Sequence, residues 1–492
     1  MSRINTNVPA IRAIHQLTAN NKSLGKSLER LSTGLRINRG ADDPAGLIAS
    51  ESLRTEIRGL STAISNSERT INVISTGDAA LGEVSKLLLQ IKSLVVQSAN
   101  DGALSDEEIS ANQDQVDALL VSIDRIANST QFNGKKLLNG ELGYVVDGQN
   151  TNNLARLQIF GARVPANSAL TVNVQVTQSA QTAQLTIGTA GAGTGIAATG
   201  GGTVSAGNNI TIEVRGTRGT EIFNFSSGTT LSTIAAAVTA TGDLTGVNAT
   251  ASATGIAFNS TQFGSNEFVS VRTLSGTFDL NPGDGGSGSA DFDLDNGRDA
   301  QVFINGQQAS VDGLVARIRS GGLDLVADLS QTFGTTSGGS DSFNIVGGGA
   351  NFQIGPNVNS DGRVSLGIPS LNPSNLGTSD AGFLNTLGSG RTAALTDSTN
   401  LPAAEQIITA AIGQVTTLSG RLGGFQANQI ETNLNSLRVA LENVTASESA
   451  IRDTDYSTEV SNLTRAQILQ QSTTRVLGIA NQIPQSVLSL LG

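Results

Sequence analysis

The sequence predicts an α+β fold: a long α-helical coiled-coil or bundle core built from both chain ends, with a β-rich domain inserted in the middle. Proline is absent from Ala45 to Gln131 and again between Pro402 and Pro484, and both stretches carry apolar residues at spacings of three and four. Such spacing is typical of amphipathic helices. The middle, roughly 144–390, is rich in Gly, Thr, Ser, Ala, Asn and Val and contains short alternating runs, which are typical of strands.

The first predicted helix carries a 3-4 alternation over three heptads, which indicates a coiled-coil seam. An asparagine in that seam, Asn21, would cost stability and could fix the register of the pairing. Gly40, Pro44 and Gly46 then end this helix and begin the next. The predicted seam consists of Ile14, Leu17, Asn21, Leu24, Leu28, Leu31 and Leu35.

A second helix is predicted from about Leu47 to Ala99, and roughly 50 helical residues would be about 75 Å long. It carries two apolar stripes, so it must pack against more than one neighbour. Its first stripe comprises Leu60, Ile64, Ile71, Ile74, Leu81, Leu88 and Val95, and its second comprises Val84, Leu87, Ile91 and Leu94. Asp101-Gly102 predicts a turn, and Ser105 with Glu108 predicts a capping box that starts a third helix ending near Asn128.

The C-terminal stretch repeats the pattern. One stripe comprises Ile408, Ala411, Val415, Leu418, Leu422 and Phe425, and it resumes after a phase slip at Ile430, Leu434, Leu437, Leu441 and Val444. The last helix carries Leu469, Val476, Ala480, Ile483, Val487 and Leu490 at spacings compatible with a seam. The two terminal seams need partners, and each is the other's nearest candidate. Neither is long enough to span a filament alone, so packing between subunits is also implied.

The middle of the chain contains alternating runs at 170–176, 210–214 and 269–272, and one convincing helix at Leu231–Val238. The alternative is a disordered low-complexity linker. Regular turn spacing and alternating β-branched residues favour folded β structure.

The composition excludes most kinds of catalytic and metal-binding site. With one histidine and no cysteine, zinc sites, thiol nucleophiles and Ser-His-Asp triads lack their side chains, so we expect no enzyme, no catalytic or metal-binding residues and no cofactor. Aromatic residues make up only 3% of the chain, so few aromatic side chains are present to line a small-molecule pocket. A net charge of −11 and a pI near 4.7 argue against nucleic acid. No run of 18 apolar residues and no apolar leader segment occur, so we expect neither a membrane partner nor a cleaved signal.

Three further features are candidate sites. His15 lies in the first helix, where an interface role is favoured over a catalytic one. The run Asp291–Gly297 resembles the opening of a calcium loop, but an EF-hand needs Gly at position six and Glu at position twelve, and Asn296 and Val302 stand there. Serines and threonines of the middle region are possible acceptors of O-linked sugars, but the sequence identifies no site.

Several motifs resemble those of bacterial flagellins, in the same order along the chain. At the front they are Arg3–Asn7, Ser27–Asn38, Ala41–Gly46, Gln97–Asn100 and Thr130–Gly134, and at the back Ile451–Asp455, Leu463–Gln471 and Ala480–Leu488. The resemblance implies an inner-core helical domain of residues 1–42 with 450–492, and an outer core of 43–177 with 348–449. It also implies an exposed insert of 178–347. A module found in flagellins and hook-associated proteins is expected at about 207–276, as two strands, a helix and two strands.

The resemblance further implies a structural subunit that self-polymerises into the flagellar filament used for swimming, located outside the cell and exported without a cleaved signal peptide. Expected partners are other copies, the cap protein, the hook–filament junction protein and an export chaperone that binds the C-terminal helix. The alternatives are a junction protein of the same family, or an adhesin-like role of the insert.

The resemblance also assigns residues to three sites. The expected self-assembly interface is Leu17, Leu24, Leu28, Leu31, Leu35, Leu469, Val476, Ile483 and Val487. The expected inter-domain spoke is Asn38, Asp42, Asp43 and Pro44. A patch read by animal immune receptors corresponds to Gln90, Leu94 and Gln115, where glutamines replace the family's arginine and glutamate, and we therefore expect weak receptor activation.

Overall fold

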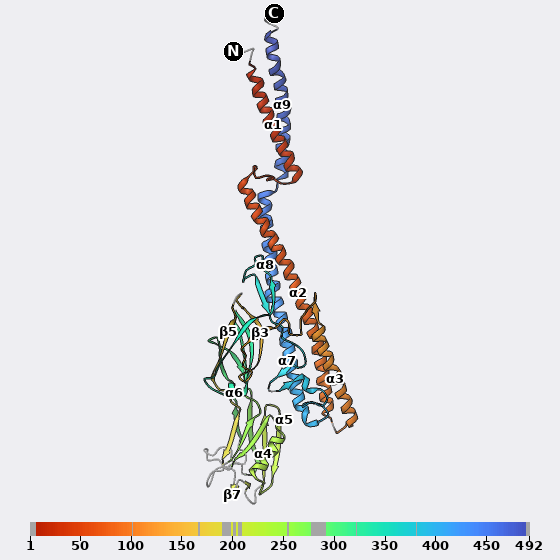
Figure 1. Ribbon diagram of the computed structural model, residues 1–492, viewed down its shortest axis with the longest axis vertical. Coiled ribbons are helices and arrows are strands. Elements are labelled where there is room, and N and C mark those ends of the chain that lie inside the picture. Colours follow the sequence, from red (N-terminus) through yellow and green to blue (C-terminus); the bar gives the residue numbers. More distant parts are fainter. Residues whose placement is uncertain are drawn as a thin grey trace. The chain divides into compact units, whose positions relative to one another are not determined.

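The computed structural model describes residues 6–100, 102–165, 168–188, 198–199, 203–204, 209–252, 255–276, 292–320, 322–379 and 381–488, without the side chains of 187–188, 198–199, 203–204, 292–293 and 483–488. Both ends of the chain are helical and the strands lie between them, which confirms the α+β prediction (Figure 1). The chain divides into two compact units. The terminal unit is Met1–Arg69, Gln353–Arg363 and Asn428–Gly492, and the central unit is Thr70–Phe352 and Val364–Ala427.

The second and third helices and the helix of the middle region begin and end close to the predicted residues. The helices are α1 (Val8–Thr33), α2 (Pro44–Ser98), α3 (Asp106–Ser129), α4 (Leu231–Ala240), α5 (Gly242–Thr245), α6 (Gln331–Gly334), α7 (Leu401–Phe425), α8 (Thr432–Arg452) and α9 (Tyr456–Leu488), with 3-10 turns η1 (Leu384–Leu387) and η2 (Ser398–Asn400) and a π-helical turn η3 (Gln426–Glu431). Ser105 and Glu108 form the predicted capping box at the start of α3, with each side chain bonded to the other residue's amide.

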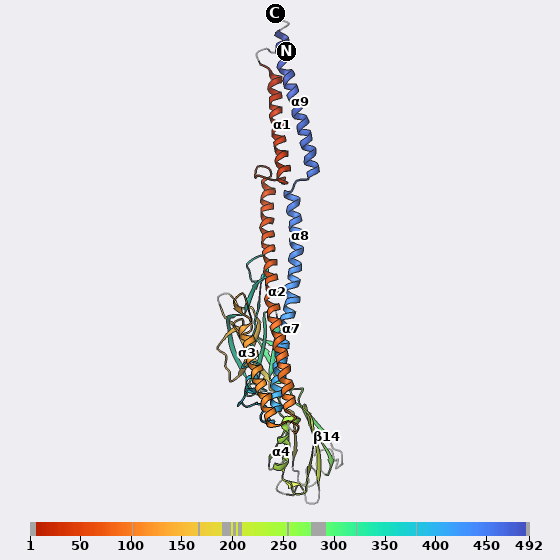
Figure 2. The same cartoon turned by 90° about the vertical axis from the view of Figure 1, so that its right-hand side faces the viewer.

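In the terminal unit, α1 and α9 lie side by side and antiparallel (Figures 1 and 2). Small or polar residues form the buried line between them. On α1 these are Ala10, Ala13, Asn20 and Ser27, and on α9 they are Glu459, Ala466, Thr473 and Ala480. The expectation that Asn21 occupies the seam is wrong, because Asn21 is exposed and its neighbour Asn20 is buried. Elsewhere in this unit, α8 packs on α2 through Leu437, Leu60 and Ala63.

In the central unit, α2 buries residues of both predicted stripes. Leu81 and Leu88 of the first stripe and Val84 and Ile91 of the second are completely inaccessible. Polar contacts join the surrounding helices: Asp78 of α2 accepts a hydrogen bond from Ser419 of α7 at 2.6 Å, and the buried Gln113 of α3 donates to the carbonyl of Leu387 at 2.8 Å. A helix buried on two sides explains why this element carries two apolar stripes.

The π-helical turn η3 explains the phase slip in the C-terminal stripe. An α-helix returns to the same face every three or four residues, but Phe425 and Ile430 are five residues apart and both are buried. A π turn accommodates one additional residue, so the stripe continues on the same face of the helix.

The strands of the central unit form four larger sheets and several hairpins. The first sheet has the order β16 (Gln307–Gln308), β15 (Gln301–Ile304), β5 (Leu170–Gln178), β20 (Ser340–Gly348), β3 (Tyr144–Asp147), and the second β17 (Ser310–Asp312), β18 (Val315–Ser320), β19 (Leu323–Leu329), β4 (Leu154–Ala162). The third is β10 (Thr220–Phe225), β9 (Ile210–Gly216), β13 (Phe268–Ser275), β14 (Phe292–Asn296), and the fourth β11 (Val247–Ser252), β12 (Gly255–Ser260), β6 (Gln184–Gly188). The short pairs are β1 (Gln131–Phe132) with β2 (Lys135–Lys136), β7 (Ala198–Thr199) with β8 (Thr203–Val204), β21 (Ala350–Gln353) with β22 (Arg363–Leu366), and β23 (Gly377–Thr378) with β24 (Gly382–Phe383).

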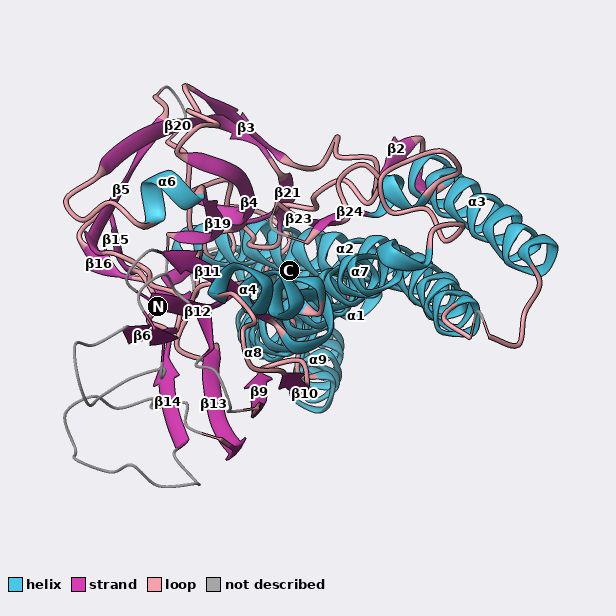
Figure 3. Cartoon of the chain, turned by 90° about the horizontal axis from the view of Figure 1, so that it is seen from below, coloured by secondary structure: helices cyan, strands magenta, loops and turns pink. Residues whose placement is uncertain are grey.

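Two apolar cores hold these sheets. The first joins the first and second sheets and includes Val174, Leu325 and, from α6, Phe333. Figure 3 shows α6 in the region of strands β5, β4 and β19 of these sheets. The second joins the third and fourth sheets over α4, around Ile212, Ile234 and Phe258. The described residues of 207–276 therefore form two strands, the helix α4, the short helix α5 and three further strands. The expectation of two strands after the helix is wrong, because β13 returns to pair with β9.

The expected domain boundaries can be placed on these sheets. Residue 177 lies in β5, which pairs with β20 through residues Leu170–Gln175, and β20 ends at Gly348. Strands assigned to the outer core and to the insert therefore share the first core. The boundaries themselves stay predictions.

Candidate assembly surface and linker

The linker after α1 pairs with the linker before α9. Gly34 ends α1 in the left-handed conformation (φ 73°), where a side chain would be strained. Leu35 then forms an antiparallel bridge with Asp453. The amide of Arg36 donates to the carbonyl of Arg452 at 2.7 Å, and that of Thr454 donates to the carbonyl of Gly34 at 2.9 Å. The two linkers, which are far apart in sequence, are thereby joined by backbone hydrogen bonds.

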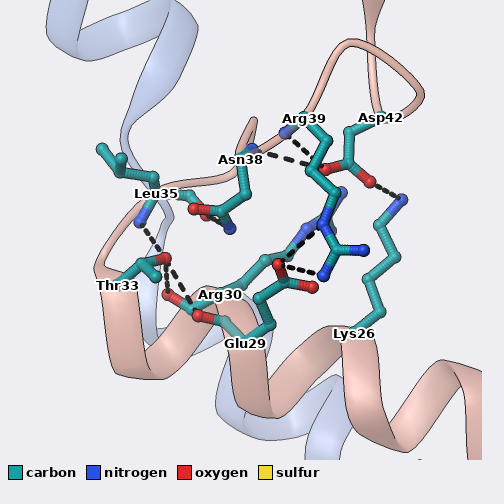
Figure 4. A network of polar contacts seen from close by, with 8 residues as sticks. All are labelled: Lys26, Glu29, Arg30, Thr33, Leu35, Asn38, Arg39 and Asp42. Carbon is teal, nitrogen blue, oxygen red and sulfur yellow. Dashed lines mark hydrogen bonds and ion pairs between the residues drawn. The ribbon is translucent and has the colours of Figure 1, made fainter.

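Asp42 organises the first linker (Figure 4). Its carboxylate accepts hydrogen bonds from the amides of Asn38 at 3.3 Å and Arg39 at 3.2 Å, and it pairs with Lys26 of α1 at 2.9 Å. The hydrogen bond from Lys26, followed by that from the Arg39 amide, lowers the pKa of Asp42. Arg39 in turn pairs with Glu29 of α1 at 2.6 Å. The loop is therefore fastened to the last turns of α1 by two ion pairs.

Asp43 and Pro44 begin α2. Pro44 is its first residue, where a missing amide proton costs nothing, and Asp43 Oδ1 accepts from the amide of Gly46 at 2.9 Å. A β-carbon at Gly46 would lie 2.7 Å from Cδ1 of the buried Ile37. The structure thus brings Asn38, Asp42, Asp43 and Pro44, the four expected spoke residues, into one linker.

The second linker carries its own charged contacts. Arg452 pairs with Glu51 of α2 at 2.8 Å. Hydrogen bonds from Arg452 and then Arg54 lower the pKa of Glu51. Asp455 accepts from the amides of Ser457 at 2.9 Å and Thr458 at 3.2 Å, and the Thr458 hydrogen bonds lower the pKa of Asp455. The sequence indicated Arg452 and Asp455 only as members of a family motif, without a role, and did not indicate Glu51.

Polar pairs set the register between α1 and α9. The side-chain amide of Asn7 donates to the carbonyl of Ala480 at 2.7 Å. Asn20 donates to Thr473 Oγ1 at 2.9 Å inside the seam. Arg30 pairs with the buried Glu459 at 3.3 Å. Buried polar groups tolerate only the register that gives them partners, so these three contacts favour one alignment.

The structure separates the predicted interface residues into two groups. Leu17, Leu24 and Leu31 are half-buried beside the seam, and Leu35 is half-buried in the linker. Leu28, Leu469 and Val476 are instead exposed, at 50%, 44% and 52%. Ile483 and Val487 lie on α9, but their side chains are outside the described residues.

Other large apolar side chains are exposed on the same helix pair. On α1 they are Val8, Ile11 and Ile14, and on α9 Tyr456, Val460, Ile468 and Ile479. Together with Leu28, Leu469 and Val476 we call these the exposed stripe. Sequence reasoning placed Ile14 in the seam and did not single out the others, although isoleucine on a polar helix is a visible signal.

The three residues of the expected receptor patch come together on the central unit. Gln90 and Leu94 of α2 and Gln115 of α3 line a surface groove of about 460 Å³ with Ser93 and Leu119. Both glutamines are exposed and Leu94 is half-buried. Every residue that lines this groove is uncharged.

The calcium-like run Asp291–Gly297 includes strand β14, and Asp295 accepts from the amide of Gln184 at 2.7 Å. Asp291 and the side chain of Asp293 are outside the described residues. Over the part of the chain that is described, no three carboxylate or histidine side chains gather as metal ligands would. Over the same part, none of the helices has the length and apolar character needed to cross a membrane.

Comparison with known proteins agrees with these features. Residues 4–142 match the bacterial flagellin N-terminal helical region, and residues 406–491 match the bacterial flagellin C-terminal helical region. A flagellin of Salmonella rubislaw is 30% identical over 526 aligned residues, covering 99% of both chains. One of Clostridium tyrobutyricum is 28% identical over 98% of this chain and 100% of its own. The chain therefore belongs to the bacterial flagellin family, structural proteins that self-polymerise into the extracellular flagellar filament.

Proposed function

We propose that this chain is the major subunit of a flagellar filament and that the exposed stripe of α1 and α9 is the contact between subunits in the filament core. The observation that carries the proposal is the exposure of ten large apolar side chains on one helix pair. Burying such a side chain contributes about 1.5–3 kcal/mol. Packing copies of the pair against one another would remove this surface from water.

The seam between α1 and α9 of one chain indicates that these helices become ordered during assembly and not before it. Alanines and polar residues make up its fully buried line, so α1 and α9 gain little apolar burial from each other alone. Ordering a residue costs about 1–2 kcal/mol of backbone entropy. We infer that the pair is poorly ordered in the free subunit and becomes ordered when neighbouring subunits cover the exposed stripe.

The partners and the export route belong to the same proposal. The cap protein and the hook–filament junction protein would contact the ends of the polymer, and an export chaperone would cover the apolar side chains of α9 before assembly. Export would proceed through the flagellar channel as an unfolded chain, without a cleaved signal peptide. Support for the chaperone comes from Ile468, Val476 and Ile479, whose exposure would otherwise favour premature association.

Electron microscopy of purified subunit, after a precipitant or filament seeds trigger assembly, tests the proposal. A chain lacking residues 450–492 is the comparison, since it removes α9 and leaves the central unit intact. Long filaments from the full chain alone are expected. If the full chain stays monomeric with seeds present, the junction-protein alternative replaces the filament subunit.

A further inference from the structure

The charge of the terminal helix pair is not explained by self-assembly. Residues 1–28 and 460–492 contain no Asp or Glu, although the whole chain has 41 of them against 30 Lys and Arg. The same two segments carry six cations: Arg3, Arg12, Lys22, Lys26, Arg465 and Arg475. Identical basic segments repel one another, so a homopolymer gains nothing from this bias.

The fold brings these two segments together. Because α1 and α9 are antiparallel, Asn7 lies beside Ala480 and Asn20 beside Thr473. Two distant acid-free stretches thereby form one surface. Arg12, Lys22, Arg465 and Arg475 are exposed on it, and within the described residues none of the four has an ion-pair partner.

Apolar side chains are interleaved with these cations. On α9, Arg465 precedes Leu469 by four residues and Arg475 precedes Ile479 by four, so each pair shares a helix face. Ile468 and Ile479 are each 61% exposed. On α1, Ile11 and Ile14 flank Arg12 in sequence and are about half exposed. Basic helices with exposed large apolar residues are typical of segments that lie in the interface of an anionic membrane.

We propose that the α1–α9 pair of the unpolymerised chain, poorly ordered in solution, forms on anionic lipid surfaces, with the cations at the headgroups and the isoleucines among the acyl chains. This departs from the expectation of no membrane partner, which concerned spanning segments. Binding at the interface requires only a few apolar side chains per helix and a complementary charge. An acidic protein would match the charge as well, and the variants below distinguish it from lipid.

The test is flotation of unpolymerised full-length chain with vesicles of phosphatidylcholine alone or mixed with phosphatidylglycerol. We expect binding to the mixed vesicles only, falling as salt rises, and little binding by assembled filaments. Arg465→Gln/Arg475→Gln should weaken partitioning about 30-fold. The matched control, Arg69→Gln/Arg125→Gln, removes two exposed cations of α2 and α3 and should leave it unchanged.

A second variant separates lipid from an acidic partner. Ile468→Ser/Ile479→Ser keeps every charge and should weaken vesicle binding about tenfold or more. Equal binding to neutral and anionic vesicles, equal loss in the control pair, or full binding by the serine variant would each overturn the proposal. The last outcome, together with displacement by polyglutamate, would assign the surface to an acidic protein instead.

Discussion

At the scale of single residues, the α1–α9 pair depends on a few buried polar contacts. Glu459 has a side chain that is 7% exposed, and its partner Arg30 is 22% exposed. The Nε atom of Arg30 is buried and has no hydrogen-bond partner. An uncompensated charge in such a position costs far more than a surface pair contributes.

Glu459→Gln should therefore lower filament stability by about 2 kcal/mol, since the guanidinium loses its counter-charge while remaining buried. The measurement is the temperature at which seeded filaments dissociate, followed by light scattering. Glu29→Gln is the control, because its pair with Arg39 is more exposed, at 34% and 72%, and its loss should cost less than about 1 kcal/mol. Equal shifts in both variants would contradict the buried-pair argument.

The receptor groove gives a second prediction at this scale. Gln90 and Gln115 share one groove with Leu94, so restoring charge at both positions alters one surface. Gln90→Arg/Gln115→Glu should raise activation of an immune-receptor reporter by about tenfold or more, because a hydrogen bond to a charged group contributes about 1.5–3 kcal/mol. Purified monomer of the unaltered chain should be weak in the same assay. A strong response from it would refute the assignment of the patch.

At the scale of elements, the sequence predicted helices better than their pairing. The spacing of apolar residues correctly predicted the helices α2, α3 and α7 and the phase slip between Phe425 and Ile430. The predicted seam coincides only in part with the line that α1 and α9 bury, because small residues fill most of that line, while Leu17, Leu24 and Leu31 lie half-buried beside it. In the structure, small residues such as Ala10 and Ala13 meet α9, while Ile14 and Leu28 remain exposed.

The pairing of strands could not be predicted from the sequence, for a different reason. β5 pairs with β20, and Leu170 lies opposite Ile345. Alternating patterns identify strands but contain no information on which of many similar strands is the neighbour. The spoke residues come from a family motif, and their role stays a prediction. The Arg452–Glu51 contact depends on the fold, and no sequence pattern indicates it.

The π turn η3 gives a prediction about this element. Deleting the exposed Asn428 would leave a spacing of four between the buried Phe425 and Ile430, which an ordinary α-helix accommodates. We expect the deletion to retain helicity by circular dichroism with a small change in melting temperature. Inserting alanine after Asn428 should instead rotate the following stripe by about 100° and expose Leu434 and Leu437. A destabilising deletion with a tolerated insertion would contradict this account.

The linkers predict acid sensitivity. Hydrogen bonds lower the pKa values of Asp42, Glu51 and Asp455. A carboxylate with a lowered folded pKa stabilises the fold fully above its unfolded pKa of about 4, and that stabilisation is lost as pH falls toward the folded value. Helicity of assembled subunits should therefore decline below about pH 4.

Asp42→Asn should make this acid transition shallower while lowering stability at neutral pH, since the variant lacks the titrating group and the Lys26 pair. Circular dichroism of filaments across the acid range measures it. Asp114→Asn, at an exposed position of α3, is the control and should follow the unaltered chain. An unchanged slope in Asp42→Asn would exclude Asp42 as a contributor.

At the scale of the whole molecule, the division into two units separates assembly from folding. The central unit contains both β cores and the part of α2 from Thr70 onward, where residues of both stripes are buried. The terminal unit contains the exposed stripe, so damage to that stripe need not unfold the rest. A substitution in the exposed stripe can test whether assembly is lost while the central unit stays folded.

Leu28→Asp should abolish filaments while the central unit stays folded. Leu28 is 50% exposed on α1 in the single chain, so a carboxylate there remains hydrated until neighbouring subunits would bury it without a partner. The control is Ile222→Asp, at a side chain of equal exposure (51%) on β10 of the central unit. Electron microscopy should show filaments only for the control, and both variants should keep the melting transition of the central unit. Normal filaments from Leu28→Asp would refute the assembly surface, and loss of the melting transition would refute the independence of the two units.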